Sequence, residues 1–321
     1  MDILPCPGWS NSPLKLRDSI GWHTVFRMMF RFAAADTMRR RWHTVFRPPE
    51  GFPMGNRICL LNLKGGVGKT SCAYHVGGVL ARSGRRVLLV DADPQASLTQ
   101  GFLGPDTTRS LPASATIAAL FDPDQIAVPE SLVRHTVFHG LDLLAGSRHL
   151  TRINMTPPEA WEEHQGALRD ALAELDAYDV TLIDCPPNLH LCSWSAMTAA
   201  SHVVVPLQPE DFGSQGLAPV QEAIAAVQSG PNPELGLAGY LLTMVDKRLT
   251  VHATYESLLR ELYRHTVFQN VVPRAKDFVE AVASRQPVSD YKPRGAAAKA
   301  VQAVADELLE RCVSAVARRV A

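Results

Sequence analysis

A short run of lysines and glycines, KGGVGKTS at 64–71, is the part of the sequence best suited to bind phosphate. Because glycine lacks a Cβ and adopts left-handed backbone angles, the N–H groups of such a loop can turn toward one anion. Lys69 could then contact the β- and γ-phosphates of a nucleotide, and the Thr70 hydroxyl could ligate Mg²⁺. The predicted phosphate-binding loop comprises Lys64, Gly65, Gly66, Val67, Gly68, Lys69, Thr70 and Ser71.

The loop differs at its start from the common phosphate-loop pattern, G-x-x-x-x-G-K-[ST]. Leu63 occupies the first glycine position, and Lys64 adds a second lysine at the entrance. The pattern K-G-G-x-G-K-[ST] is the deviant Walker A motif of the ParA/MinD ATPases, and the chain resembles that family here. An apolar run at 57–63 precedes the loop and a helical pattern follows it, which favours a phosphate site over a glycine-rich turn without a ligand.

Two further motifs strengthen this resemblance, which covers about residues 54–312. The segment DADPQASLT at 91–99 is similar to the family pattern D-x-D-P-Q-x-x-x-T. The segment IDCPP at 183–187 is similar to the family's Walker B aspartate and double proline. The segments 205–217 and 243–248 also match the family, so the chain is interpreted as a ParA/Soj-type partition ATPase.

The resemblance implies a role for each motif in the slow hydrolysis of ATP. Asp93 would position or deprotonate the attacking water, because a carboxylate near the γ-phosphate can orient the nucleophile in line. Asp184 would hold Mg²⁺ directly or through water, with the Thr70 hydroxyl and Asp93 beside it. Asp91 would support the loop or the outer shell of the magnesium ion. The resemblance also places two further residues at the nucleotide, Gln95 and Pro186.

Lys64 is a candidate catalytic residue together with Lys69 and Asp93, but Lys69 already serves hydrolysis, so the second lysine needs a separate explanation. In the family, a lysine at this position reaches the phosphates of ATP in the other subunit of a nucleotide-sandwich homodimer. Two triphosphates buried face to face repel strongly, and a cation from each side offsets that repulsion. The homodimer is therefore expected with ATP and not with ADP.

The resemblance further implies two partners, a ParB-like activator and DNA bound without sequence preference. Such DNA binding depends steeply on salt, because it releases counterions from the phosphates. Arg274 aligns with a basic position that relatives use and is the first candidate for a DNA contact. The other candidates are Lys247, Arg248, Lys276, Arg285, Lys292, Arg294 and Lys299.

Two alternatives belong to other functional classes. A MinD-like ATPase on a membrane would need a C-terminal amphipathic helix, but 308–320 lacks bulky apolar anchors and is expected to pack in the core. An iron–sulfur protein would need two bridging cysteines per subunit, and Cys185 and Cys192 lie too close together to resemble that arrangement. A membrane partner and a cluster are therefore not expected.

Composition agrees with one large α/β domain in the cytoplasm, and the family resemblance implies association with the nucleoid. The 321 residues are 46% apolar, and Lys+Arg and Asp+Glu balance at 32 each, so no overall charge indicates a nucleic-acid partner. No apolar run approaches membrane-spanning length. The six cysteines form no C-x-x-C pair and are expected to be reduced and mostly packed; they are residues 6, 59, 72, 185, 192 and 312.

Strand and helix patterns alternate from residue 57 onward, which predicts a doubly wound, mostly parallel α/β sheet with helices on both faces. Its ligand should bind at the carboxyl ends of the strands. Strands are predicted at 57–63, 86–91, 141–145, 180–184, 202–207, 237–244 and, at an edge, 271–273. Helices are predicted at 70–82, 114–121, 124–134, 158–175, 192–200, 216–229, 251–263 and 296–319.

Residues 1–53 differ from the ATPase domain at 54–321. Eight Lys/Arg against four Asp/Glu make this stretch basic, and turn residues at both ends predict a weakly ordered extension or sequence upstream of a true start at Met54. A basic arm that touches DNA or a membrane surface is the alternative. The tetrapeptide His-Thr-Val-Phe occurs at 23–26, 43–46, 135–138 and 265–268, and is expected in tolerant surface segments.

Overall fold

The computed structural model describes residues 56–124, 127–157, 164–209 and 214–320, all of which belong to one unit of the chain, Gly51–Ala321. The predicted extension at 1–53 and the start at Met54 lie outside the described residues, as do 158–163 and the side chains of 210–216. Seven strands form one sheet in the order β3-β4-β2-β5-β1-β6-β7. They are β1 (Asn56–Leu60), β2 (Val87–Asp91), β3 (Val133–His135), β4 (Leu141–Leu144), β5 (Val180–Asp184), β6 (His202–Leu207) and β7 (Gly236–Leu242).

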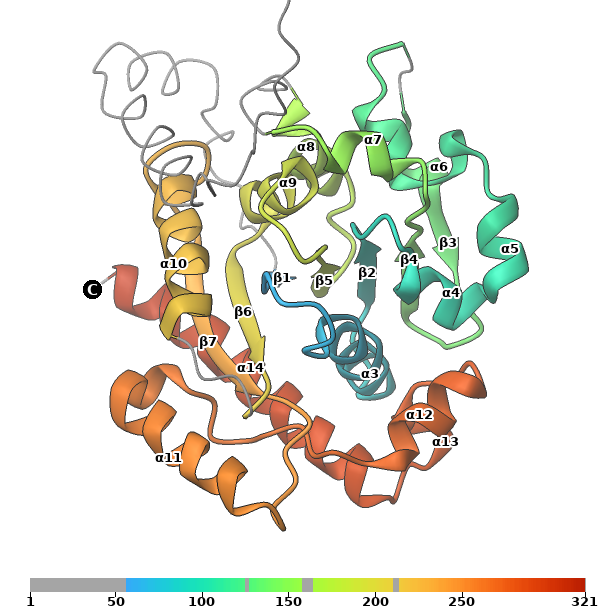
Figure 1. Ribbon diagram of the computed structural model, residues 1–321. Coiled ribbons are helices and arrows are strands. Elements are labelled where there is room, and N and C mark those ends of the chain that lie inside the picture. The colour runs from blue at the N-terminus through green and yellow to red at the C-terminus, as the bar shows by residue number, and fades with distance from the viewer. Residues whose placement is uncertain (1–55, 125–126, 158–163, 210–213, 321) are drawn as a thin grey trace, which may run out of the picture. The chain divides into compact units, whose positions relative to one another are not determined.

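Every strand pair is parallel except β3 with β4, so the predicted doubly wound, mostly parallel sheet is confirmed. Figure 1 shows the sheet between two layers of helices. The helices are α3 (Lys69–Arg82), α4 (Ser97–Leu103), α5 (Pro105–Ser110), α6 (Pro129–Leu132), α7 (Leu150–Asn154), α8 (Ala167–Glu174), α9 (Leu191–Ala199), α10 (Ser214–Gln228), α11 (Thr250–Tyr263), α12 (Lys276–Ala283), α13 (Val288–Tyr291) and α14 (Ala296–Val320), with 3-10 turns η1 (Ala113–Ala115), η2 (Ile117–Phe121) and η4 (Arg264–Thr266).

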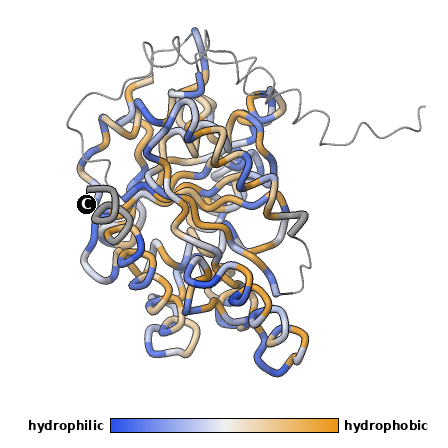
Figure 2. The backbone as a smooth tube through the Cα atoms, turned by 90° about the vertical axis from the view of Figure 1, so that its left-hand side faces the viewer, coloured by the Kyte–Doolittle hydropathy of each residue, from blue (hydrophilic) through white to orange (hydrophobic). Residues whose placement is uncertain are grey.

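The strands are apolar on both sides because each face of the sheet is covered. Side chains alternate along a strand, so Ile58 and Leu60 of β1 pack with α3, α12 and α14, whereas Cys59 packs with α8, α9 and α10. Figure 2 shows the apolar chain gathered in the middle of the molecule and polar segments around it. This double burial is what fixes the strand ends, and with them the loops that carry the candidate site.

Helix α3 approaches its neighbours closely through two glycines. A Cβ on Gly77 would lie 2.7 Å from Leu89 Cδ2, and a Cβ on Gly78 would lie 2.1 Å from Pro287 Cβ. Glycine costs about 1 kcal/mol of helix propensity relative to alanine, but here it permits the contacts with β2 and with the chain before α13. The helix that begins at the phosphate loop is therefore held tightly on the sheet.

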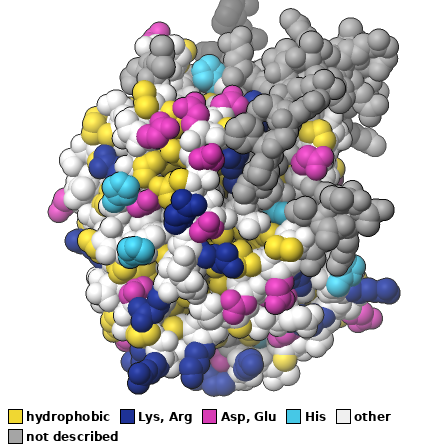
Figure 3. Space-filling view, turned by 180° about the vertical axis from the view of Figure 1, so that it is seen from behind, with side chains coloured by type: hydrophobic (Ala, Val, Ile, Leu, Met, Phe, Trp, Pro, Cys, Tyr) yellow, Lys and Arg dark blue, Asp and Glu magenta, His cyan; other side chains and the backbone are white. Residues whose placement is uncertain are grey.

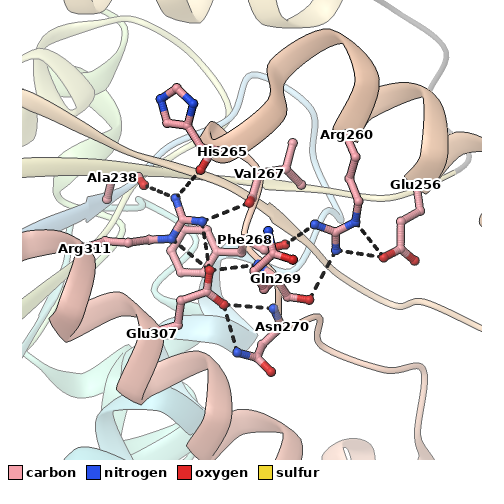
Figure 4. A network of polar contacts seen from close by, with 10 residues as sticks. All are labelled: Ala238, Glu256, Arg260, His265, Val267, Phe268, Gln269, Asn270, Glu307 and Arg311. Atoms are coloured by element: carbon pink, nitrogen blue, oxygen red, sulfur yellow. Dashed lines mark hydrogen bonds and ion pairs between the residues drawn. The ribbon is translucent and has the colours of Figure 1, made fainter.

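The C-terminal helix α14 is tied to the sheet by two charged side chains, which Figure 4 shows from close by. Glu307 accepts hydrogen bonds from the backbone N–H groups of Gln269 and Asn270, at 2.8 Å each. Leu308 and Cys312 are buried against the core, so the core packing predicted for 308–320 is confirmed at these two positions, whereas Val313 is 63% exposed and the side chains of 314–320 lie outside the described residues. Arg311 bonds Glu307 and also donates to the carbonyl oxygens of Ala238 (3.0 Å), His265 (3.0 Å) and Val267 (2.9 Å).

The five described cysteines are buried and free, which confirms the prediction of reduced, packed thiols for them; Cys6 lies outside the described residues. They are Cys59, Cys72, Cys185, Cys192 and Cys312.

Two predicted elements are wrong. The helix expected at 124–134 is reduced to α6, and the chain then forms β3, which turns back antiparallel onto β4 through a loop that ends at Gly140 (φ 75°). The edge strand expected at 271–273 is an isolated bridge between Val245 and Pro273, because proline has no N–H to extend a ladder. The short helices α4, α5, α7, α12 and α13 were not predicted.

The expectation of surface positions for His-Thr-Val-Phe holds for one described copy and is wrong for the other. At 135–138, Val137 is 93% exposed. At 265–268, Val267 and Phe268 are fully buried, and the guanidinium of Arg311 lies 4.3 Å from the centre of the Phe268 ring. The second copy is part of the core because it packs between β7 and α14. The copies at 23–26 and 43–46 lie outside the described residues.

Candidate active site

The glycine loop lies where β1 ends and α3 begins, at the carboxyl ends of the parallel strands. Gly66 (φ 77°) and Gly68 (φ 87°) both have left-handed backbone angles, which glycine adopts without a steric penalty. The first hydrogen bond of α3 runs from Cys72 N to Gly68 O. The N–H groups before Cys72 have no acceptor within the helix and are directed out of its N-terminal end. The loop and the helix end therefore present backbone donors to the same place, as an anion site requires.

Lys69 lies beneath the loop rather than on the surface. Its Nζ donates to the backbone oxygens of Asn62 (2.9 Å) and Lys64 (3.0 Å). Burial lowers the pKa of Lys69, and the nearby carboxylates of Asp184 and Asp93 oppose that shift. A buried ammonium group of this kind interacts strongly with an anion, since little water screens it.

Asp184 ends β5 and is fully buried. Neither of its carboxylate oxygens has a hydrogen-bond partner within the described residues. Burial raises the pKa of Asp184 well above its usual value, and the carboxylate of Asp91 raises it further, while the nearby Thr70 hydroxyl and Lys69 lower it. Two buried oxygens without donors, next to a hydroxyl and further carboxylates, form the donor set that a hard cation such as Mg²⁺ prefers.

Asp91 holds the loop that follows β2. One of its oxygens accepts from Thr99 N (2.8 Å) and from Thr99 Oγ1 (2.7 Å), and the Thr99 hydroxyl in turn accepts from Gly146 N (2.9 Å). Burial raises the pKa of Asp91, and these hydrogen bonds oppose that shift. This arrangement agrees with the support role expected for Asp91, which is fully buried, whereas the next carboxylate, Asp93, is only partly buried.

The other expected site residues occupy the same edge of the sheet. Asp93 is partly buried, and its Oδ1 accepts from the N–H of Gln95 (2.9 Å), whose side chain is exposed. Lys64 is exposed at the loop entrance, and Pro186 is buried just beyond Asp184. The structure therefore brings the three motifs together, although they are separated by about 20 and 90 residues in the chain.

Three residues at the loop were not assigned a role from the sequence. Asn62 donates to Pro206 O (2.8 Å) and accepts from Lys64 N (2.9 Å), so it joins the loop to β6. Gln208 and Thr243 follow β6 and β7 and donate to loop carbonyls. Both belong to segments that resemble the family, but only the folded structure shows that their partners are in the phosphate loop.

Comparison with known proteins identifies the family of the chain. A family model described as an AAA domain matches residues 55–237. The chain is 33% identical to the chromosome-partitioning ATPase Soj of Treponema pallidum over 259 residues, which are 80% of this chain and 98% of that protein. It is 34% identical to the chromosome partitioning protein ParA of Caulobacter vibrioides, over 79% of this chain and 94% of that protein. The chain belongs to the ParA/Soj family.

Solved structures with the ParA/Soj fold include nucleotide complexes. Cobyrinic acid a,c-diamide synthase from Mycobacterium smegmatis, with bound ADP and magnesium, has a TM-score of 0.64 at 31% identity and covers 78% of this chain and 93% of its own. The septum site-determining protein MinD from Pyrococcus horikoshii, complexed with Mg-ADP, has a TM-score of 0.60 at 22% identity, covers 78% of this chain and 94% of its own, and shows the fold alone.

The DNA candidates of this ParA/Soj chain differ in their ion pairs. Arg248 is bound by both oxygens of Asp246, at 2.9 and 2.6 Å. Lys276 lies 3.3 Å from Glu280, and Lys292 lies 3.1 Å from Asp277. Arg274 is exposed and forms no ion pair with any residue that the structure describes.

Proposed function

We propose that the protein is a ParA-type ATPase that binds Mg-ATP at the loop 64–71, dimerises in that state and moves a cargo by binding DNA. The observation that carries this proposal is the buried carboxylate of Asp184, with two unpartnered oxygens, next to Thr70 and Lys69. Within the described residues there is no group of three or more His, Cys, Asp or Glu side chains able to hold a metal ion. The site at Asp184 and Thr70 therefore suits a magnesium ion that is also bound by phosphate oxygens and water.

The chain's own groups divide the work of hydrolysis. The N–H groups of the loop and Lys69 bind and neutralise the phosphates, with Gln95 and Pro186 beside the nucleotide. Thr70 and Asp184 hold Mg²⁺, which supplies charge stabilisation at the phosphoryl oxygens when bound, and Asp93 lies at the edge of this donor set. Asp93 orients the attacking water and accepts its proton, because it is partly buried and accessible whereas Asp91 and Asp184 are fully buried. A ParB-like activator accelerates this slow step.

Dimerisation is assigned to Lys64. Its side chain is exposed at the loop entrance, whereas the Lys69 amine is already bonded to two loop carbonyls. An exposed ammonium group beside one triphosphate can reach the triphosphate of a facing subunit and offset the repulsion between them. Lys64→Gln is expected to remain monomeric with ATP and to keep its own nucleotide site, whereas Lys299→Gln, at another exposed lysine, should dimerise normally. Parent-like dimerisation of Lys64→Gln would contradict this role.

DNA binding is supported by the distribution of cations. Figure 3 shows Lys and Arg side chains gathered at the lower end of the rear face, the end where α12 and α13 lie in Figure 1. Overall charge is balanced, so the attraction to DNA has to come from such a local patch. Such a patch fits a cytoplasmic protein that associates with the nucleoid, as the proposed function requires.

The deciding experiment is co-sedimentation of the full chain with DNA and, separately, with liposomes, in ATP, ADP and no nucleotide. We expect DNA binding with ATP only, and loss of that binding in Lys64→Gln. No helix within the described residues combines the length and apolar character needed to cross a bilayer. Binding to liposomes without binding to DNA would overturn the proposal in favour of a MinD-like ATPase that works on a membrane.

A further inference from the structure

Two carbonyl groups of the phosphate loop are hydrogen-bonded by side chains that follow the neighbouring strands β6 and β7. Gln208 Nε2 donates to Gly66 O at 3.0 Å and also contacts Met244 Sδ. Thr243 Oγ1 donates to Val67 O at 2.8 Å, and Leu207 O lies slightly farther from the same hydroxyl, at 3.1 Å. The partners are 142 and 176 residues apart in the chain, so these are tertiary contacts and not part of the local turn.

The geometry of the peptide bond gives these contacts a consequence on the other side of the loop. A C=O and the N–H of the next residue belong to one planar unit and point in opposite directions. A donor that fixes Gly66 O therefore fixes the N–H of Val67, and a donor that fixes Val67 O fixes the N–H of Gly68. Each of these N–H groups therefore points away from the side chain that holds its peptide unit, and neither donates a backbone hydrogen bond within the described residues.

The residues that follow β7 also lie close to the loop. A Cβ on Gly68 would lie 3.6 Å from Met244 Cε and 3.7 Å from Thr243 Cβ, which is ordinary van der Waals contact. Thr243 is 1% exposed, so water cannot replace its hydroxyl at Val67 O. The two peptide units are thus held by side chains that follow β6 and β7.

We infer that Gln208 and Thr243 are positioning residues that preset the Val67 and Gly68 N–H groups for a phosphate oxygen before nucleotide binds. Donors that are already oriented bind an anion without the cost of ordering the loop. The inference deepens the proposed nucleotide site and rests on it, but it does not depend on DNA binding, on dimerisation or on an activator.

The test measures nucleotide affinity and loop exchange in the same variants. Thr243→Val keeps the side-chain shape and removes the hydroxyl, and Thr243→Ser restores it. We expect Thr243→Val to bind fluorescent ADP with Mg²⁺ about five- to tenfold more weakly, as the loss of one hydrogen bond implies, and Thr243→Ser to recover most of the affinity. Hydrogen exchange of the 64–71 peptide in the nucleotide-free protein should be faster in Thr243→Val and normal in Thr243→Ser.

Gln208→Leu provides a second variant, because Gln208 is only partly buried and its replacement does not threaten folding. The matched controls lose similar side chain-to-carbonyl bonds elsewhere: Thr254→Val loses the bond to Thr250 O (3.1 Å), and Gln228→Leu loses the bond to Leu235 O (2.6 Å). Both controls should bind ADP as the parent does.

Parent-like affinity and loop exchange in both Thr243→Val and Gln208→Leu would overturn the inference. Weaker binding without faster exchange would also overturn it, because the side chains would then act on the nucleotide directly. If the parent itself failed to bind ADP, the proposed nucleotide site would fall, while the exchange measurement would still report whether the two side chains order the loop.

Discussion

A buried carboxylate without a hydrogen bond is costly, and Asp184 has two such oxygens next to other acidic groups. This cost favours the binding of a cation, because the carboxylate oxygens are already desolvated before the ion arrives. The raised pKa of Asp184 follows from burial first and from Asp91 second. Since the fold favours the protonated form, the ionised carboxylate lowers the stability of the metal-free protein as pH rises above the ordinary carboxyl range.

Asp184→Asn should therefore stabilise the protein while it destroys the site. We expect the Tm without nucleotide to rise by a few degrees at pH 7, since about 1 kcal/mol moves the Tm of a domain of this size by about 2–4 °C. The further rise in Tm that Mg²⁺ adds to nucleotide should be lost. Thermal unfolding with and without Mg-ADP tests both statements, with Asp142→Asn as a control at a carboxylate that is hydrogen-bonded to Tyr178 and His135. A lower Tm for nucleotide-free Asp184→Asn would contradict the argument.

The sequence predicts the residues whose chemistry is local, and misses those that act through distant partners. Lys69, Asp93 and Asp184 stand in recognisable patterns at strand ends. Gln208 and Thr243 act on the loop only because β6 and β7 end beside it, which spacing along the chain does not reveal. Asn62 is similar, since its amide partner is a carbonyl of β6, 144 residues away.

At the scale of elements, α3 joins the phosphate loop to the helices near the C-terminus. His75 lies on the side of α3 that faces α12 and α13, with its Nδ1 accepting from Val288 N at 3.1 Å and its ring 5.0 Å from the Phe278 ring centre. Burial lowers the pKa of His75 to about 3, from an ordinary value of 6.5. The folded protein therefore keeps this imidazole neutral under conditions in which the unfolded chain takes up a proton.

This contact should make stability depend on pH. The contribution of His75 is complete above about pH 6.5 and is lost progressively as pH falls toward 3, because only the unfolded state gains the proton. Between pH 7 and 5 this linkage amounts to about 2 kcal/mol of unfolding free energy. The side chain of His75→Asn can still accept from Val288 N. Between pH 7 and 5, the unfolding free energy of this variant, measured with urea, should therefore fall by about 2 kcal/mol less than that of the parent. His139→Asn, at an exposed position, is the control and should follow the parent; equal slopes in all three proteins would refute the assignment.

The elements themselves are predictable where they are long and regular. The apolar runs that became β2, β5 and β6 and the helical patterns of α3 and α11 were confirmed nearly to the residue. The short helices α4, α12 and α13 carry little periodicity of their own, and they form because tertiary contacts hold them, as His75 does for α13. The antiparallel β3 was missed because only one of its three residues, Val133, is apolar.

At the scale of the whole molecule, DNA affinity depends on how many cations are available to phosphate. Arg274 is exposed and outside any ion pair that the structure describes, whereas Arg248 and Asp246 form a locally neutral pair. Neutral pairs release few counterions, so the total count of basic residues overstates the binding surface.

Arg274→Ala should lower the slope of log affinity against log salt by about one in the ATP state, and weaken binding similarly on DNA of any sequence. The double variant Arg248→Ala, Asp246→Ala removes a pair of zero net charge and should leave the slope unchanged. Filter binding over a range of salt concentrations gives both values. An unchanged slope in Arg274→Ala would remove this residue from the DNA surface.

The segment that follows α11 has a consequence for how the protein behaves at high concentration. A sheet edge with free N–H and C=O groups is a template on which another chain can add a strand and start aggregation. Along β7, Phe268 N donates to Tyr240 O, Val272 N donates to Leu242 O, and Arg311 covers Ala238 O. The opposite edge, β3, is only three residues long. The buried copy of His-Thr-Val-Phe thus helps to prevent the β7 edge from pairing with the sheet of another copy of the protein. Substitutions that weaken the packing of this segment should therefore favour aggregation before they affect the phosphate loop.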